Sequence, residues 1–409
     1  MAALRSSIRH YRFFSSSTTT TTKSTSPLTI FGVKAKFRSE HDPDKALEIY
    51  NSLSDTYAYP MANRCAQDLT VKRLAKSRRF ADIAKLIDSH KKNPKITQEN
   101  YFSTLIRSYG LAGMYDHAFR LFNQMDELGT PRSSISFNAL LTAYNVSKKF
   151  DEVPKLFNEI SEKFGISPDK ISYGILIKSY CELSLPESAF SILKEMDEKK
   201  IEITAITYTT ILDSFYKKRK VEGAEQIWKQ MIEKGCTPDV TAYNVRIMHA
   251  SWGKPEDVLS LIDEMTKAGL KPDIITYNYL CTCYFKNGMM EDANKVYQDL
   301  QENGCFPNPE TFRLNIFYLC KSGDFEKAYE VFMESVKKDK VPAFGTMKIL
   351  VEGLVKNSKT KEATSVFKIV RKKFPNNLLN AWKKLEDDLG LSKDEETLTK
   401  KADASAASA

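Results

Sequence analysis

A pattern that recurs about every 35 residues limits the possible folds of this chain more than any other feature. An aromatic residue early in a predicted helix recurs at intervals of 34–36 residues, and Met347 continues the series: Phe102, Phe137, Tyr173, Tyr208, Tyr243, Tyr277 and Phe312. A chain that repeats one unit grows by stacking copies rather than by enlarging one core. The 409 residues therefore predict a solenoid rather than two or three globular domains.

A second series with the same period marks a second helix in each unit. Its members are small or β-branched residues: Ile83, Ala118, Val153, Ala189, Ala224, Val258, Ala293, Ala328 and Ala363. Apolar residues follow three and four positions later, which places them on one helix face. Most units close with a glycine and then a proline, as at Gly269 and Pro272, a pattern that ends a helix. The predicted fold is all-α, a solenoid of helix–turn–helix repeats of about 35 residues.

The N-terminal segment has the composition of an organellar transit peptide. Residues 1–38 contain seven Lys and Arg, no Asp or Glu, and a Ser/Thr-rich run, without the apolar core of a secretory signal. Arg12-Phe13-Phe14 predicts cleavage after residue 14 and resembles the cleavage site of mitochondrial presequences. We expect a mitochondrial location, with the plastid as the alternative. A transit peptide and leader over 1–38 is the first predicted segment.

The remaining boundaries follow from how well each stretch fits the repeat. Residues 39–98 are helical in pattern but fit it poorly, which predicts a degenerate N-terminal cap, and residues 99–369 form the regular array. A final amphipathic helix within 370–395 predicts a C-terminal cap. The low-complexity tail over 396–409 is predicted to be unstructured.

The residues that metal sites, disulfides and enzymes require do not gather in this sequence. The seven cysteines include no C-x-x-C pair and the five histidines are scattered, so we expect no metal, no cofactor and a reducing compartment. Cys281 and Cys283 are predicted to pack in the core. No phosphate loop or catalytic cluster occurs, which predicts that the chain is not an enzyme. No run of 18 apolar residues occurs, so no membrane span is expected.

The motifs of the repeat resemble a known family. Units open with runs such as Val240-Thr241-Ala242-Tyr243-Asn244 and close with runs such as Gly269-Leu270-Lys271-Pro272-Asp273. Over residues 100–370, and more weakly from 64, the chain resembles the pentatricopeptide repeat proteins, in their pure-repeat, plant organellar subclass. Tetratricopeptide repeats have a period of 34 and lack Pro-Asp closings. The resemblance implies a right-handed superhelix that holds single-stranded RNA, either mRNA or rRNA, with one base per repeat.

In that family, two positions per repeat read the base: the residue after the aromatic anchor and the residue after the closing proline. Asn, Thr and Asp there offer short, fixed donors and acceptors to a base edge. The pairs are Ser103/Ser133, Asn138/Asp169, Gly174/Thr204, Thr209/Asp239, Asn244/Asp273, Asn278/Asn308 and Arg313/Ala343. By resemblance, Asn/Asp prefers U, Thr/Asp prefers G and Asn/Asn takes a pyrimidine. The implied target is U-N-G-U-Y, and the three other pairs depart from the family pattern.

Two further positions complete the implied RNA site. An aliphatic residue two positions before the anchor sandwiches the base in the family, which here implies Ile135, Ile171, Ile206 and Ile275. A lysine nine positions after the anchor meets phosphate, which implies Lys217, Lys286, Lys321 and Lys356. At Glu310 and Gly345 the chain lacks the aliphatic residue, so base reading is expected within 135–308.

These features rank three functions. The first is an organellar single-stranded RNA-binding protein, non-catalytic, which acts in RNA metabolism or translation. The alternative is a structural RNA-binding component of the mitochondrial ribosome, because the array is short and the base sequence that its reading pairs specify occurs often by chance. Ribosomal or other ribonucleoprotein subunits would then be partners. The third is a helical scaffold for proteins.

Overall fold

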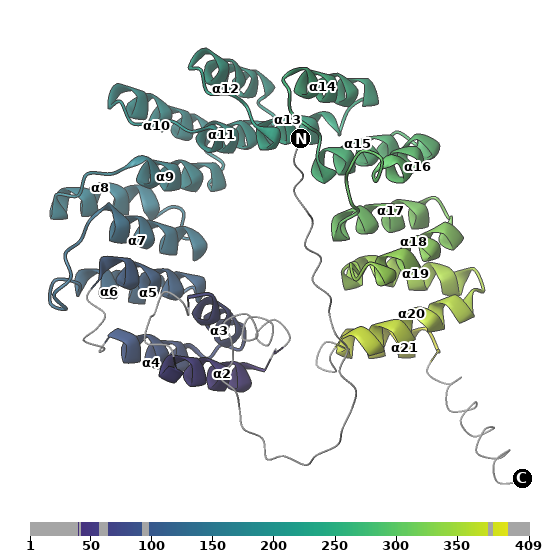
Figure 1. Ribbon diagram of the computed structural model, residues 1–409, viewed down its shortest axis with the longest axis horizontal. Coiled ribbons are helices and arrows are strands. Elements are labelled where there is room, and N and C mark those ends of the chain that lie inside the picture. Colours follow the sequence, from purple (N-terminus) through teal and green to yellow (C-terminus); the bar gives the residue numbers. More distant parts are fainter. Residues whose placement is uncertain (1–39, 41, 57–63, 92–97, 375–378, 392–409) are drawn as a thin grey trace, which may run out of the picture. The chain divides into compact units, whose positions relative to one another are not determined.

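The computed structural model describes residues 40, 42–56, 64–91, 98–374 and 379–391 (Figure 1). In this part of the chain every regular element is a helix: α2 (Pro43–Thr56), α3 (Arg64–Lys76), α4 (Phe80–Lys91), α5 (Glu99–Leu111), α6 (Tyr115–Asn123), α7 (Ser134–Val146), α8 (Val153–Phe164), α9 (Lys170–Glu182), α10 (Pro186–Glu198), α11 (Ala205–Lys217), α12 (Val221–Glu233), α13 (Val240–Ala250), α14 (Pro255–Lys267), α15 (Ile274–Lys286), α16 (Met290–Asp299), α17 (Pro309–Lys321), α18 (Phe325–Lys337), α19 (Phe344–Lys356), α20 (Thr360–Lys373) and α21 (Asn380–Asp388). The predicted leader and tail lie outside the described residues.

The helices form two compact units, residues 1–179 and residues 180–409. Within the first unit, α5 packs against α3 and α7. Within the second unit, α11, α13, α15, α17 and α19 each pack against the next in that order, and each also packs against the helix that follows it in sequence. In both units the first helices of successive repeats therefore form one layer, and the second helices cover it.

Both periodic series point into the core. Every member of the second-helix series, from Ile83 to Ala363, is 0% exposed, because a side chain of this size lets the two helices of a repeat approach closely. Seven of the eight first-helix anchors are buried, and Tyr277 is half-buried. Cys281 and Cys283 are buried free thiols, as predicted. The prediction of an all-α solenoid is confirmed.

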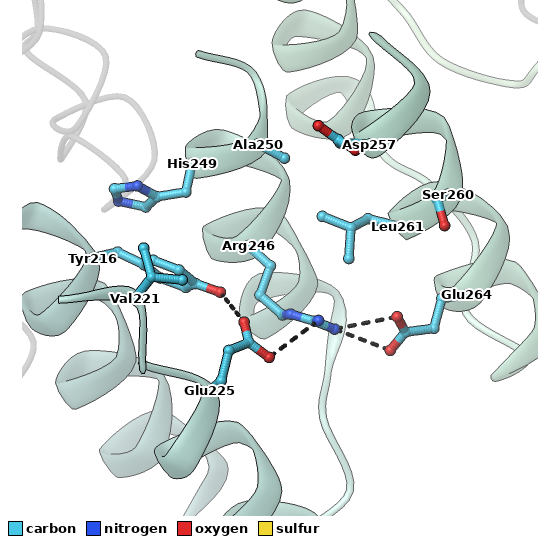
Figure 2. Close-up of a pocket in the computed structure, with 10 residues that line it drawn as sticks. All are labelled: Tyr216, Val221, Glu225, Arg246, His249, Ala250, Asp257, Ser260, Leu261 and Glu264. Atoms are coloured by element: carbon cyan, nitrogen blue, oxygen red, sulfur yellow. Dashed lines mark hydrogen bonds and ion pairs between the residues drawn. The ribbon is translucent and has the colours of Figure 1, made fainter. Parts of the chain in front are cut away.

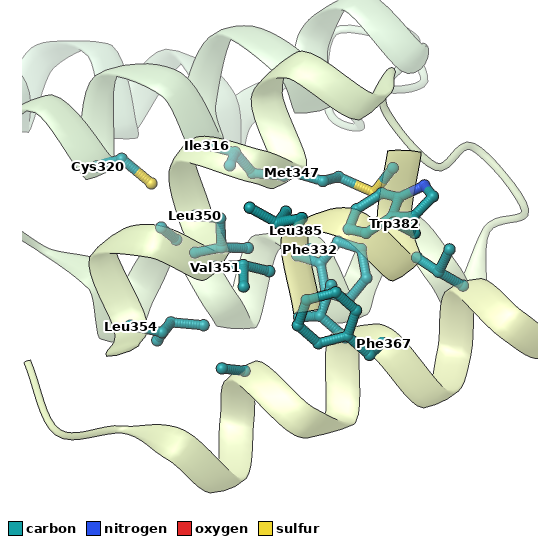
Figure 3. Packing of buried hydrophobic residues seen from close by; sticks show 14 of the residues in the cluster. Ile316, Cys320, Phe332, Met347, Leu350, Val351, Leu354, Phe367, Trp382 and Leu385 are labelled. Atoms are coloured by element: carbon teal, nitrogen blue, oxygen red, sulfur yellow. The ribbon is translucent and has the colours of Figure 1, made fainter. Parts of the chain in front are cut away.

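The C-terminal end of the second unit is closed by a large apolar cluster. Phe332 of α18, Phe367 of α20 and Trp382 of α21 pack together with aliphatic residues of α17 and α19 (Figure 3). The indole of Trp382 meets the rings of Phe344 and Phe367 edge to face, with centroid distances of 4.8 and 5.8 Å. Helix α21, which lies within the predicted capping segment, thus covers the last repeat.

Seven of the second helices, from α6 to α18, are each followed by a residue in the left-handed conformation, eleven or twelve positions after the small marker. Gly129, Gly165, Gly235, Gly269 and Gly304 all have positive φ there, as the closing pattern predicts. Lys200 and Asp339 take the same place in the two repeats that lack the glycine, with φ of 55°. A side chain in this conformation carries a steric cost that glycine avoids.

Lys200→Gly is therefore expected to stabilise the protein. The steric relief exceeds the extra backbone entropy of glycine, which gives a gain of about 0.5–1 kcal/mol in the free energy of unfolding. Lys199→Gly is the matched control, because Lys199 has φ −82° and is expected to lose about that amount. Chemical denaturation of the full chain measures the free energy of unfolding of both variants. An equal effect of the two substitutions would contradict the claim that the backbone is strained at Lys200.

No helix in the described part of the chain is long and apolar enough to cross a membrane. The same residues contain no cluster of three or more His, Cys, Asp or Glu side chains that could hold a metal ion.

Candidate nucleic-acid interface

The predicted pair Asn138/Asp169 is joined by hydrogen bonds. Asp169 precedes α9, and its Oδ1 accepts the backbone N–H groups of Ile171 and Ser172, both at 2.9 Å, which caps the helix. The Asn138 amide, on α7, donates to Asp169 Oδ1 at 3.0 Å and Oδ2 at 3.2 Å. The Ser172 hydroxyl donates to Asn138 Oδ1 at 2.6 Å. The two polar side chains are therefore fixed before any ligand arrives.

The same arrangement recurs in the second unit. The Asn244 amide donates to Asp273 Oδ1 at 3.1 Å, and the Thr276 hydroxyl donates to Asn244 Oδ1 at 2.7 Å. Asp273 and Thr276 also form a reciprocal capping box at the start of α15. A fixed amide beside a fixed carboxylate presents a donor and an acceptor at set positions, which suits a nucleobase edge.

The pair Asn278/Asn308 has the same arrangement, with a longer distance between the two side chains. The Asn278 amide lies 3.5 Å from Asn308 Oδ1, and the hydroxyl of Thr311 donates to that oxygen at 3.0 Å. Thr209/Asp239 differs, because the Thr209 hydroxyl donates to the Ala205 carbonyl of its own helix at 2.8 Å while Asp239 caps α13. Among the described residues, no direct hydrogen bond joins Thr209 to Asp239.

Asp169 is held in its charged form. Burial acts to raise the pKa of Asp169, but hydrogen bonds from the Ser172 backbone and from the side chains of Asn138 and Ser172 outweigh it and lower the pKa below its usual range. At neutral pH this position therefore offers a carboxylate, which can accept but not donate a hydrogen bond.

The first predicted pair, Ser103/Ser133, is occupied by a residue that the sequence did not single out. Glu99, at the start of α5, accepts the backbone N–H and the hydroxyl of Ser133, both at 2.7 Å, and the N–H of Ser136 at 2.9 Å. A carboxylate at the N-terminus of α7 satisfies its free N–H groups and complements the helix dipole. The Ser103 hydroxyl is buried without a partner. Glu99 thus fills the place where this repeat would meet a base.

Glu99→Gln is expected to destabilise the first unit, and the effect should depend on pH. Burial acts to raise the pKa of Glu99, but hydrogen bonds from Ser136 and Ser133 together lower it below the usual value of about 4.3. A depressed folded-state pKa gives stability that is complete above about pH 5 and is lost as the pH falls through the folded-state pKa. The difference in melting temperature between wild type and variant should therefore shrink from pH 7 to pH 3. A difference in melting temperature that does not change with pH would contradict this role of the Glu99 carboxylate.

The pair at the other end, Arg313/Ala343, is closed by an ion pair. Arg313 donates from Nε and Nη2 to the two carboxylate oxygens of Glu310, at 2.7 and 2.5 Å. Glu310 stands where four other repeats have the predicted sandwiching isoleucine. The predicted reading position Arg313 and the sandwiching position Glu310 are therefore engaged with each other.

A cavity of about 720 Å³ brings several predicted residues together in the second unit. It lies along α15 and α17 beside the end of α13, and its lining includes Ile275, Asn278, Asn308 and Lys286. Ile275, Asn278 and Lys286 lie on one face of α15, since they are spaced by three and eight residues. A sandwiching, two reading and one phosphate position predicted from sequence thus share one groove. Trp252, Tyr279 and Phe317 add aromatic rings to its walls.

The predicted sandwiching isoleucines are all exposed. Ile135, Ile171, Ile206 and Ile275 are 44–74% accessible, although apolar side chains of this size are usually buried. Each lies in the first turn of a first helix, next to a reading pair. Their exposure leaves them available as walls for a flat ring.

The four predicted phosphate lysines are exposed at the ends of first helices, in different settings. Lys217 forms an ion pair with Asp213 at 2.6 Å, and that contact raises the pKa of Lys217. The Lys286 ammonium lies 3.0 Å from the centroid of the Trp252 ring. Surface ion pairs of this kind are weak, so Lys217 can exchange its partner for a phosphate at little cost.

A second cavity, between α12, α13 and α14, has a different chemistry (Figure 2). Arg246 lies between Glu225 and Glu264, at 3.6 and 3.0 Å, and its guanidinium stacks on Trp228 with 4.3 Å to the ring centroid. The Tyr216 hydroxyl donates to Glu225 at 2.7 Å. With Asp257 the lining has three carboxylates against one guanidinium, which disfavours phosphate. This cluster links the four helices α11 to α14, and the groove along α15 suits RNA better.

Comparisons with known proteins match the repeats and the fold of the chain. Three pentatricopeptide repeat models match the chain: the pentatricopeptide repeat domain at 191–251, the PPR repeat family at 132–182 and 272–316, and the PPR repeat at 101–130, 171–201, 247–270 and 316–339. The fold resembles that of the pentatricopeptide repeat protein PPR10 in complex with an 18-nt psaJ RNA element, with a TM-score of 0.52 and 21% identity over 85% of this chain and 56% of that one.

Two relatives from Arabidopsis thaliana match nearly the whole chain. One is the small ribosomal subunit protein mL103 (rPPR7), 52% identical over 96% of both chains. The other is a mitochondrial pentatricopeptide repeat-containing protein, 50% identical over 96% of this chain and 94% of its own. The second name bears out the mitochondrial location predicted from the leader. The repeated motifs, the stacked helix pairs and these relatives show that the chain belongs to the pentatricopeptide repeat family.

Proposed function

We propose that this protein is a non-catalytic mitochondrial RNA-binding protein that holds single-stranded RNA along the layer of first helices. One observation carries the proposal: the groove along α15 joins an exposed aliphatic wall at Ile275, a polar pair at Asn278 and Asn308, and a cation at Lys286. Single-stranded RNA needs these three elements: a surface for the base face, donors and acceptors for the base edge, and charge for the phosphate.

We infer that the reading segment lies in the middle of the array. Glu99 occupies the first pair and the Arg313–Glu310 ion pair closes the last, so the usable pairs run from Asn138 to Asn308. The implied target U-N-G-U-Y recurs about once in 128 positions of random sequence, since three bases and one pyrimidine are specified. Such a target cannot select one transcript. The protein therefore acts where RNA is already presented to it.

A second candidate function is favoured by one of the relatives. The chain is 52% identical to a small ribosomal subunit protein over 96% of both chains. A structural place in the small subunit of the mitochondrial ribosome would supply the additional contacts that a short reading segment lacks. In this role the protein would bind rRNA and hold it in a fixed conformation.

Two measurements test these functions. In fluorescence anisotropy, purified protein should bind a single-stranded RNA that contains U-N-G-U-Y more tightly than one in which U, G and U are each replaced by A. Equal affinity, or no binding, contradicts base reading.

Tagged protein in a mitochondrial sucrose gradient should sediment with the small ribosomal subunit if the second function holds. Sedimentation with smaller, RNase-sensitive complexes favours a free RNA-binding protein instead.

A further inference from the structure

The turn between α13 and α14 is built differently from the corresponding turns of the array. Helix α13 has 11 residues, whereas α11 and α15 have 13, and the anchors Tyr243 and Tyr277 are 34 residues apart. The other turns place a left-handed residue eleven positions after the anchor, as at Arg219 and Gly288. The corresponding residue here, Lys254, has an extended backbone. Helix α13 ends seven positions after its anchor, whereas α11 and α15 end nine positions after theirs, so the side chain nine positions after the anchor projects from the turn rather than from the helix.

That side chain is Trp252. It stands nine positions after its anchor, where Lys217, Lys286, Lys321 and Lys356 stand in their own repeats. Its side chain is 75% exposed, although Trp228 and Trp382 are only 6% and 5% exposed. Single exposed aromatic side chains do occur, but Trp252 shares its groove with Tyr279 and Phe317, and a cluster of aromatic rings is typical of a binding surface. An aromatic ring thus replaces a cation in the row of predicted phosphate contacts.

Trp252 also lines the groove along α15, together with Lys286. The Lys286 ammonium lies against the Trp252 ring, 3.0 Å from its centroid, and burial lowers the pKa of Lys286. An aromatic platform with a cation beside it is the combination by which proteins bind single-stranded nucleic acids without reading their sequence.

The platform lies apart from the reading pair of the same groove. Asn278 and Lys286 are eight residues apart on α15, which corresponds to roughly 12 Å along the helix axis. The groove, with a volume of about 720 Å³, therefore has room for a second base beside one held at Asn278. We propose that Trp252 stacks a second nucleobase of the bound strand, one that is turned out of the row of read bases, and that Lys286 holds a phosphate next to it. This inference rests on the proposed RNA-binding function.

Fluorescence offers a direct test, because Trp252 is the one exposed tryptophan of the three in the chain. Full-length protein is titrated with a single-stranded RNA that contains U-N-G-U-Y and flanking nucleotides. Stacking should quench the emission at long wavelength and protect it from acrylamide. Trp252→Ala should weaken binding about 5- to 100-fold, whereas Trp252→Phe should lose less, because a base stacks on any aromatic ring. The matched control is Phe306→Ala, since Phe306 is also exposed but does not line the groove.

Salt dependence separates the two partners of the platform. Lys286→Ala should reduce the slope of log affinity against log salt by about one, whereas Trp252→Ala should leave that slope unchanged. Both variants should keep the melting temperature of the wild type. Binding of RNA by the wild type with no change in Trp252 emission, and equal affinity of Trp252→Ala, would overturn the stacking and leave the proposed function standing. No RNA binding by the wild type would overturn both.

A third result would reassign the surface. If Trp252→Ala binds RNA as tightly as the wild type but no longer sediments with ribosomal particles, the indole contacts a protein, and base stacking is overturned.

Discussion

Exchanging Thr209 and Asn244 for one another is expected to reverse the order of two adjacent bases in the preferred RNA. The double variant Thr209→Asn/Asn244→Thr has the composition and charge of the wild type. By family resemblance, Thr209 with Asp239 prefers G, and Asn244 with Asp273 prefers U. The wild type should therefore prefer U-N-G-U-Y and the variant U-N-U-G-Y. At about 1–3 kcal/mol per base, each mismatched position should cost roughly 5- to 150-fold in affinity.

Competition between the two RNAs in an anisotropy assay measures this change in base preference. The control variant Thr266→Asn/Asn303→Thr makes the same swap between two exposed residues outside the reading positions, and it should keep the preference of the wild type. Equal weakening for both RNAs in the double variant would mean that Thr209 and Asn244 support the fold without reading bases.

Trp382→Ala is expected to lower the stability of the C-terminal end of the second unit by about 3–5 kcal/mol, the usual range for a buried aromatic side chain. The indole packs edge to face against Phe344 and Phe367. Its removal leaves a cavity in the apolar cluster, where Figure 3 shows Trp382 and Phe367. Each repeat contacts only its neighbours, so the loss should stay local. Hydrogen exchange should therefore speed up in α19, α20 and α21 more than in α11 and α13.

Trp252→Ala is the matched control for stability, because it removes the same side chain from an exposed position. It should change the free energy of unfolding by less than about 0.5 kcal/mol. Uniform acceleration of exchange throughout the second unit of Trp382→Ala would show that the repeats unfold as one block, contrary to the nearest-neighbour view.

The fold could be predicted from the sequence because its signals repeat. One aromatic anchor is ambiguous, but eight positions in register specify the first helices, and the small residues that are now seen to be fully buried specify the second. The predicted reading pairs follow from the same period. Asn138 and Asp169 are 31 residues apart, yet the period places them side by side, and the structure joins them through a hydrogen bond.

Features that break the period could not be found in this way. Glu99 reaches the N-terminus of the next first helix, and this contact depends on the approach of α5 to α7 rather than on any motif. The Arg313–Glu310 ion pair was visible only as two departures from the family pattern. Trp252 did give a signal, since it occupies the register of the lysines, but its exposure became clear only when the early end of α13 could be seen.

Asp273 belongs to two repeats at once. Its carboxylate binds the amide of Asn244 in one repeat and caps α15 of the next, whose first turns carry Ile275 and Asn278. A base that formed a hydrogen bond with Asp273 would therefore contact the same carboxylate that caps α15, the helix that carries the next predicted site. Because hydrogen bonds already hold this carboxylate in the free protein, its loss would weaken the supports of two neighbouring predicted sites at once.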